Sequence, residues 1–322
     1  MGLCTQRHRD PLCSSILQYG SYRKRKEKEG QNVYVIVQSF INGLLNGGIY
    51  ALVAVGMTIV FGTMKMINFA LGEFLTFSMY IAWLMNTLLD VSTYANLPFV
   101  ILASAILAYL VFKICLQPLL GRDGNSIVLV TVGLSYLMQN AFLLIFGSNP
   151  KSMPYALKGQ ALHIGDYSLS YARLIAFAAG IVLIIAVNLL INKTTMGKAM
   201  KATSEKPEIA QELGINTTKV FTFSYIISII MAGIAGLLLT PLYTIAPMTG
   251  VTIKQTTMMI VVLGGMGSVG GALASGLLCG VIEAMVSALV AQELGPVGIF
   301  ALFLVVVFFK PQGLFGRKGR VV

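Results

Sequence analysis

The chain has 322 residues, of which 56% are hydrophobic and only 11% charged, and its mean hydropathy is +0.81. Globular domains carry about 25% charged residues, so this composition excludes a soluble globular protein and indicates an integral membrane protein. The 23 Lys and Arg exceed the 12 Asp and Glu, but they concentrate in the termini and in one central loop. That distribution is typical of cytoplasmic membrane loops and does not indicate nucleic-acid binding.

Residues 1–32 form a polar extension that contains the basic stretch RKRKEK at 23–28. The apolar run that follows is much longer than the about 7–15 residues of a signal-peptide core. We therefore expect a disordered cytoplasmic extension rather than a cleaved signal. At the other end, 311–322 is expected to be a basic cytoplasmic tail.

Seven apolar runs fill residues 33–310, which we expect to form one transmembrane domain. They lie at about 33–61, 69–89, 97–116, 127–146, 171–191, 221–239 and 252–309. The last run is too long for a single helix of roughly 20 residues, and glycines interrupt it near 264–271 and 295–296. The sequence thus predicts an all-α, polytopic membrane protein with about eight transmembrane helices, or nine if 252–263 also crosses.

The charges of the loops predict which side each loop faces. The basic loops 113–123 and 193–219 and the C-terminal tail should be cytoplasmic, whereas 147–170 and 241–250 should face outward. An outer loop before a cytoplasmic tail requires an odd number of crossings after residue 250, and three fit the length. Counting backward places GTMKMIN (62–68) inside and the N-terminus outside, which conflicts with a cytoplasmic RKRKEK.

Two glycine-interrupted segments lie in opposite halves of the chain. In the first, Gly62 and Gly72 flank Lys65, Asn68 and Glu73; the second is LGGMGSVGGALASG at 263–276. Corresponding glycine breaks are typical of a pathway between two repeats, because irregular backbone at membrane depth must line a cavity or be buried in protein. Tight cytoplasmic turns are the alternative interpretation.

The second segment also predicts close helix packing. GMGSVG at 265–270 fits the GxGxxG pattern but lacks the strand and βαβ unit of a dinucleotide site. Small residues recur instead every four positions, at Gly267, Gly271, Ser275 and Cys279, which lets another helix approach. Glu283 is the next residue on this ridge, and it has either a pathway or interhelical role or only a capping one.

The central loop has the pattern of two short amphipathic helices. Met196, Ala199, Met200 and Thr203 share one helical face, and Ile209, Ala210 and Leu213 share another. Pro207 and Glu208 suit a helix start, and Gly214 a helix end. Such a hairpin suits docking to a partner, although an ordinary solvated loop has similar features.

No enzymatic motif is present in the sequence. His8 and His163 are far apart, and no metal-binding, nucleophile-elbow or nucleotide-binding motif occurs. The four cysteines, Cys4, Cys13, Cys115 and Cys279, have no ligand spacing and are expected to be free thiols. Energy for any transport must come from an ion gradient or from another subunit.

Five stretches occur together in a family order: NGLLNGGIYALVAVGMTIVFGTMKMINFALGEF (42–74), MGKAMKATSEKPEIAQELGIN (196–216), AGIAGLL (232–238), VVLGGMGSVGGALASGLLCGVIEA (261–284) and FKPQGLFG (309–316). With them, residues 38–316 resemble the LivH-type permeases of bacterial branched-chain amino-acid ABC importers. Lys206 departs from the family pattern, in which a capping Asp or similar residue is common, and this weakens the predicted start of the second loop helix.

The resemblance implies a multi-pass permease subunit of the bacterial cytoplasmic membrane that binds no cofactor itself. Its implied partners are a second, LivM-like permease, two LivG- and LivF-like ATPases that bind ATP and Mg²⁺, and an extracytoplasmic binding protein that delivers Leu, Ile or Val. The central loop becomes the coupling element on the ATPases, with contacts expected from Met196, Gly197, Met200, Pro207, Glu208, Ala210, Leu213 and Gly214. The expected substrate pathway contains Asn46, Tyr50, Asn68, Phe69 and Glu73, each of which could instead have a packing role.

Three alternatives remain open from the sequence. Relatives carry urea, short amides or other amino acids, so the substrate is not fixed. A self-contained ion-coupled transporter should contain more intramembrane charges than Glu73 and Glu283. A membrane scaffold without transport activity should tolerate loss of Asn68 and Glu73.

Overall fold

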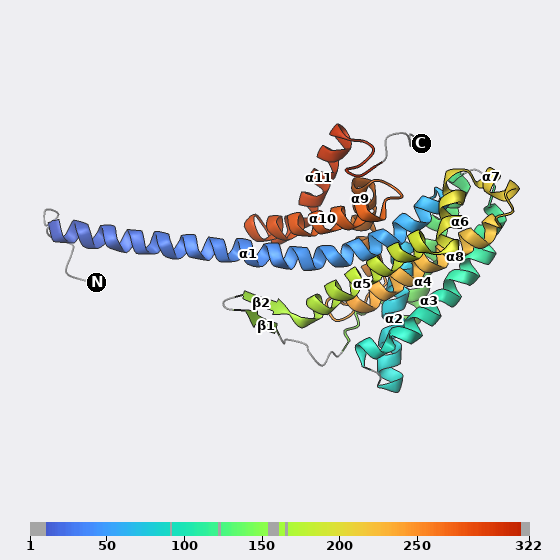
Figure 1. Cartoon of the computed structure of the whole chain (residues 1–322). Helices are drawn as coiled ribbons and strands as arrows, with labels where there is room; N and C mark the ends of the chain where they lie inside the picture. The colour runs from blue at the N-terminus through green and yellow to red at the C-terminus, as the bar shows by residue number, and fades with distance from the viewer. Residues whose placement is uncertain (1–10, 91, 122–123, 154–160, 165–166, 317–322) are drawn as a thin grey trace.

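The computed structural model describes residues 11–90, 92–121, 124–153, 161–164 and 167–316, with side chains from Tyr34 onward in the first helix. These residues form a helical bundle with one small hairpin (Figure 1). The helices are α1 (Pro11–Met64), α2 (Leu71–Leu89), α3 (Leu97–Val111), α4 (Gly124–Phe146), α5 (Tyr171–Lys193), α6 (Thr195–Glu205), α7 (Pro207–Glu212), α8 (Thr217–Leu239), α9 (Thr249–Gly264), α10 (Val269–Leu289) and α11 (Gly295–Phe309). The antiparallel hairpin pairs β1 (Ala161–Ile164) with β2 (Tyr167–Ser170).

The predicted all-α membrane fold is confirmed. Seven helical segments of the described chain are long and apolar enough to cross a membrane. α2 is an eighth long hydrophobic helix, with 19 residues that include Glu73. α9 has 16 residues, about 24 Å at 1.5 Å per residue, so it is slightly short for a full crossing of about 30 Å. This matches the predicted count of eight, or nine with the short piece.

The N-terminal extension differs from its prediction. Residues 11–32 continue α1 as helix rather than disordered chain, while residues 1–10 lie outside the described part. At the start of its described side chains, Tyr34 stacks on Tyr167 of the β hairpin with ring centres 5.4 Å apart, and Gln38 Nε2 donates to the Ser168 carbonyl at 2.6 Å. α1 therefore passes the β hairpin at Tyr34 and Gln38, and its N-terminal part extends beyond the hairpin (Figure 1).

The other end of α1 lies beside the C-terminal tail. A Cβ on Gly62 would lie 3.4 Å from Gly267 Cα in the α9–α10 turn, and the tail covers that turn because Leu314 N donates to Leu263 O at 2.7 Å. With this end cytoplasmic, as the basic loops predict, the N-terminus of α1 lies on the opposite side. This is the arrangement of the count that placed 62–68 inside, and the side on which the extension lies stays a prediction.

The two loops predicted to face outward are joined to each other. Lys151 and Ile245 exchange two backbone hydrogen bonds of 2.8 Å, which link the α4–α5 loop to the α8–α9 loop. The Lys151 ammonium also lies 5.4 Å from the ring centre of Trp83, near the end of α2, close enough for a cation–π contact. The outer ends of α2, α4 and α8 are thus held together.

α1 lies between α10 on one side and α5 and α8 on the other (Figure 1). Its contact with α10 is made by glycines. A Cβ on Gly43 would lie 2.7 Å from Gly280 O, one on Gly47 would lie 2.8 Å from Gly276 O, and one on Gly276 would lie 2.7 Å from Ala51 Cα. Helix association in lipid depends on such close packing.

The predicted small-residue ridge of α10 faces α9. Gly271 contacts the Gly264 carbonyl so closely that no Cβ would fit, and Ser275 Oγ donates to Ile260 O at 3.0 Å. Cys279 is fully buried as a free thiol, while Gly267 takes the left-handed φ of 88° in the α9–α10 turn. Cys115 is also a free thiol, whereas Cys4 and the side chain of Cys13 lie outside the described residues.

We predict that Gly276→Leu strongly destabilises the protein, because the new side chain would have to displace the α1 backbone. Overpacking of this kind costs about 1–3 kcal/mol or more, measurable as a lower unfolding temperature in detergent. The matched control is Gly270→Leu, at an exposed position of the same helix where a Cβ meets nothing within 4 Å. Equal unfolding temperatures for the two variants would contradict the glycine contact.

Candidate functional site

The first glycine-interrupted segment is a true break between two helices. α1 ends at Met64, Lys65 adopts the left-handed φ of 53°, and α2 starts only at Leu71. Asn68 is 1% exposed, and its Oδ1 accepts a hydrogen bond of 3.0 Å from Ala70 N. The Asn68 amide also lies within hydrogen-bonding reach of the Tyr225 hydroxyl in α8. Asn68 thus supplies a hydrogen-bond acceptor to a backbone N–H of the break. Such a group needs a partner within the protein because the membrane interior offers no water.

The start of α2 meets the start of α9. A Cβ on Gly72 would lie 2.8 Å from the carbonyl carbon of Gly250 and 2.9 Å from Lys254 Cβ. Only glycine allows this approach at both positions. Two helix starts from opposite halves of the sequence therefore lie against each other.

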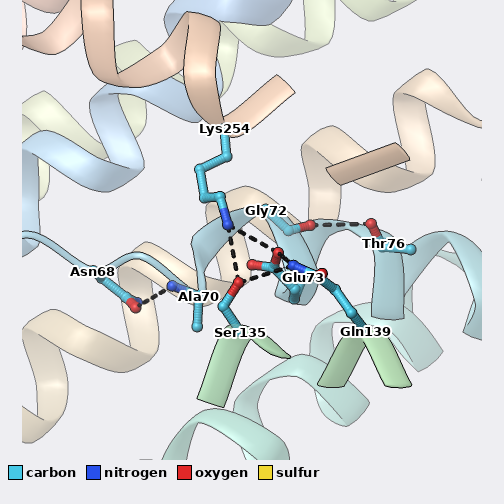
Figure 2. A network of polar contacts seen from close by, with 8 residues as sticks. All are labelled: Asn68, Ala70, Gly72, Glu73, Thr76, Ser135, Gln139 and Lys254. Atoms are coloured by element: carbon cyan, nitrogen blue, oxygen red, sulfur yellow. Dashed lines mark hydrogen bonds and ion pairs between the residues drawn. The ribbon is translucent and has the colours of Figure 1, made fainter. Parts of the chain in front are cut away.

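A buried ion pair connects these two helix starts (Figure 2). Lys254 Nζ of α9 lies 2.9 Å from Glu73 Oε1 of α2, and the side chains are 11% and 1% exposed. From α4, Gln139 Nε2 donates to the same Glu73 oxygen at 2.7 Å, while Ser135 Oγ lies 3.0 Å from both Lys254 Nζ and Gln139 Nε2. The other carboxylate oxygen, Glu73 Oε2, is buried with no partner among the described residues.

Sequence reasoning singled out Glu73 but missed Lys254. The signal was present, because Lys254 is the one charged residue of the apolar piece 252–263, and an intramembrane cation calls for a partner. Ser135 and Gln139 gave a weaker signal, since their four-residue spacing puts both on one helical face. The pairing itself joins residues 181 positions apart, which no local pattern could predict.

A second polar cluster surrounds Tyr50 of α1. Its hydroxyl lies within hydrogen-bonding reach of Glu283 in α10 and of Tyr243 in the α8–α9 loop. Glu283 Oε2 is buried without a partner in the described chain. Glu283 thus makes an interhelical contact, one of the roles that the sequence analysis considered for it.

The five predicted pathway residues divide between these places. Asn68, Phe69 and Glu73 lie together at the break before and within α2, whereas Tyr50 lies with Glu283 at the α1–α10 contact. Asn46 and Phe69 are half-buried, and the other three are buried. The structure thus brings three of them together and places Tyr50 in a separate cluster.

An apolar hollow opens beside the break. Its lining comes from the last turns of α1, from the break, from α9 and from the α9–α10 turn, and consists of Met57, Phe61, Ile67, Met258, Val261, Val262 and Met266. On α9, Met258 follows Lys254 by four residues and Val261 by seven, so all three lie on one helical face. On α9 the lining of the hollow thus begins one helical turn beyond Lys254.

The predicted loop hairpin is present as two helices. α6 is capped by Thr194, whose Oγ1 accepts from Gly197 N at 3.0 Å. α7 starts at Pro207, with Lys206 at its N-cap making no side-chain cap bond, as its departure from the family pattern suggested. Gly214 ends the hairpin at φ 83°.

The face expected to dock on a partner is only partly available. Gly197, Met200 and Ala210 are buried within the chain, and Met200 and Ala210 are each 2% exposed. They hold the hairpin against α5 and α8. Their predicted role as contacts to an ATPase is therefore corrected to a packing role within this chain. Met196 is half-buried. The exposed positions form what we call the α7 surface: Pro207, Glu208, Ile209, Glu212, Leu213 and Gly214.

Residues 39–308 match the family described as the branched-chain amino acid transport system permease component. The chain belongs to this permease family. The match includes both glycine breaks, the ion pair and the α6–α7 hairpin. The protein is thus a multi-pass membrane permease, a component of a transport system that works with partner subunits.

Three relatives illustrate how far the similarity extends. The permease is 32% identical over 301 residues to the high-affinity branched-chain amino acid transport system permease protein BraD of Pseudomonas aeruginosa, covering 88% of this chain and 97% of the relative. It is 30% identical over 300 residues to LivH of Escherichia coli K12, at 89% and 97% coverage. A probable LivH of Methanocaldococcus jannaschii is 28% identical over 264 residues, at 78% and 81% coverage.

We predict energetic coupling between Glu73 and Lys254 in the permease. Glu73→Gln and Lys254→Met should each leave one unpaired buried charge and cost roughly 3–5 kcal/mol. The double variant should cost clearly less than the sum of the single ones. Unfolding temperatures in detergent test this, with Lys198→Met on the exposed side of α6 as the control. Additive losses would mean that the two side chains do not depend on each other.

Proposed function

We propose that this permease translocates the branched-chain amino acids Leu, Ile and Val as one membrane subunit of an ATP-driven importer. The observation that carries the proposal is the similarity to BraD and LivH, which extends over 97% of each relative's length. The hollow beside α9 encloses only about 20 Å³, too little for an aliphatic amino acid, but all seven lining residues are apolar, which suits such a substrate once the hollow widens.

The proposed assembly contains a second, LivM-like permease, two cytoplasmic LivG- and LivF-like ATPases and an extracytoplasmic binding protein. In this assembly ATP and Mg²⁺ are held by the ATPases, and this chain binds no cofactor and catalyses no reaction. The proposed location is the bacterial cytoplasmic membrane, with α6, α7 and the tail inside and the β hairpin outside.

The α6–α7 hairpin is the proposed coupling element. Its buried residues fix it to α5 and α8, so a displacement of the hairpin would move both helices. Its α7 surface is the part free to contact an ATPase, with Leu213 as its most exposed apolar residue at 76%. Closure of the ATPases would thus tilt helices of the bundle and alternate the access of the pathway.

The proposed pathway includes Asn68, Phe69 and Glu73 at the first break, with Asn46 and Tyr50 on α1. The helix break supports this role because non-helical backbone within a membrane is tolerated where protein or a cavity surrounds it. Substrate affinity would come mainly from the binding protein.

Uptake by the reconstituted complex tests the proposed function. Vesicles that contain both permeases and both ATPases, supplied with the binding protein, should accumulate labelled leucine only when ATP is enclosed with the ATPases. Urea, a short amide and a cationic amino acid serve as competing solutes. Uptake that continues without the ATPases would indicate an ion-coupled transporter, and no uptake of Leu, Ile or Val would reject the proposed substrate.

We predict that Leu213→Asp weakens ATPase association, because it places a charge in a contact that excludes water. An unpaired buried charge costs several kcal/mol, so co-purification of the ATPases should fall about tenfold or more. Ser92→Asp, exposed near the outer end of α2, is the matched control. Leu213→Asp should leave the unfolding temperature of the permease unchanged, and wild-type ATPase recovery would rule out α7 as the docking surface.

A further inference from the structure

The buried ion pair is the least expected feature of this membrane bundle. Glu73 and Lys254 lie on two different helices, with 1% and 11% of their side chains exposed. Removing such charges from water is costly, and a pair of apolar residues would often be at least as stable. The pair is therefore weak support for stability and calls for another role.

One detail points to a ligand rather than to a purely structural clasp. Glu73 Oε1 receives both Lys254 Nζ and Gln139 Nε2, yet Glu73 Oε2 is fully buried without a hydrogen-bond donor among the described residues. The Asn68 amide, at the break just before α2, lies within hydrogen-bonding reach of the buried Tyr225 hydroxyl of α8. One carboxylate oxygen, Glu73 Oε2, thus remains unused at this helix break.

The apolar hollow lies further along α9, past Lys254. Met258 lies one helical turn beyond Lys254, about 6 Å along the axis, and Ile67 directly precedes Asn68; both line the hollow. A pair of opposite charges thus lies beside an apolar surface. This combination is complementary to an α-amino acid with an aliphatic side chain, which carries an ammonium, a carboxylate and a branched hydrocarbon on adjacent carbons.

We propose that Glu73 and Lys254 form a transit site for a zwitterionic aliphatic amino acid. Glu73 accepts hydrogen bonds from the substrate ammonium, and Lys254 donates to the substrate carboxylate. The hollow holds only about 20 Å³ in this structure, so it widens as α2 and α9 separate and then receives the hydrocarbon side chain. This inference rests on the proposed function and specifies how its substrate is recognised.

The charge balance explains how such a site can be both empty and filled within a membrane. A zwitterion that enters between the two side chains gives each of them a new opposite charge, so no buried charge is left unpaired at any stage. When the substrate leaves, Glu73 and Lys254 pair again at 2.9 Å and close the route to ions. The close contact of Gly72 with Gly250 belongs to this closed state, so α2 and α9 must separate to admit substrate.

The test uses the complete importer in vesicles and measures leucine imported per ATP hydrolysed. The double variant Glu73→Gln/Lys254→Met removes both charges and leaves neither partner unpaired, so it should assemble. Its ratio of leucine imported to ATP hydrolysed should fall at least about tenfold below wild type, a loss of at least about 1.4 kcal/mol. Ser135→Ala, which removes two hydrogen bonds and no charge, should change the ratio much less. A double variant that assembles with the wild-type ratio would overturn the transit site.

A labelling experiment decides the question even if the double variant fails to assemble. Met258→Cys and its neighbour Met259→Cys, which does not line the hollow, are placed in a chain without its four native cysteines. Leucine transport with ATP should slow the reaction of Met258→Cys with a small aqueous thiol reagent at least about tenfold and leave Met259→Cys unaffected. Equal or absent protection at both positions would overturn the proposal.

The outcomes separate this inference from the proposed function. If wild-type vesicles import leucine but neither variant nor labelling responds as expected, the function stands and the transit site is wrong. If the wild-type complex carries only an uncharged solute such as urea, the proposed function is wrong, and a site for a zwitterion is rejected with it.

Discussion

Close approach of helix backbones is the constraint on which the rest of this structure depends. Within lipid the hydrophobic effect does not drive helices together, so association relies on packing and interhelical hydrogen bonds. Glycine contacts join α1 to α10, α2 to α9, and α9 to α10. α9 takes part in two of these three contacts although it has only 16 residues. The position of α9, and with it that of Lys254, depends on glycines in α2 and α10 that let its backbone approach theirs.

The same packing accounts for the polar interior. Once α2 and α9 start against each other, the first-turn carboxylate of Glu73 has no water, and Lys254 supplies its counter-charge. α4 contributes the remaining hydrogen bonds through Ser135 and Gln139. Each polar group thus depends on a neighbour from another helix. Such a network fixes the relative position of three helices more strictly than apolar contacts would.

Much of this arrangement can be predicted from local sequence. Pro207 and Gly214 marked the bounds of α7, and small residues every four positions marked α10 as a packing helix. Local patterns do not show which other helix a given helical face contacts. The ridge of α10 was recognised while its contact with α9 was not, and Ala210 was assigned to a docking face although it packs inside the chain. Lys254 was overlooked for a related reason, because an isolated lysine in a short apolar segment acquires meaning only beside Glu73.

The outer bridge between Lys151 and Ile245 gives α2 a mechanical role. Trp83, which contacts Lys151, and Glu73, which contacts Lys254, are ten residues apart on one uninterrupted helix, about 15 Å along its axis. A continuous helix of this length is stiff, so it works as a rod with one end at the outer surface and the other at the ion pair. The bridged loops and Glu73 are therefore connected through α2 itself, without the α6–α7 hairpin.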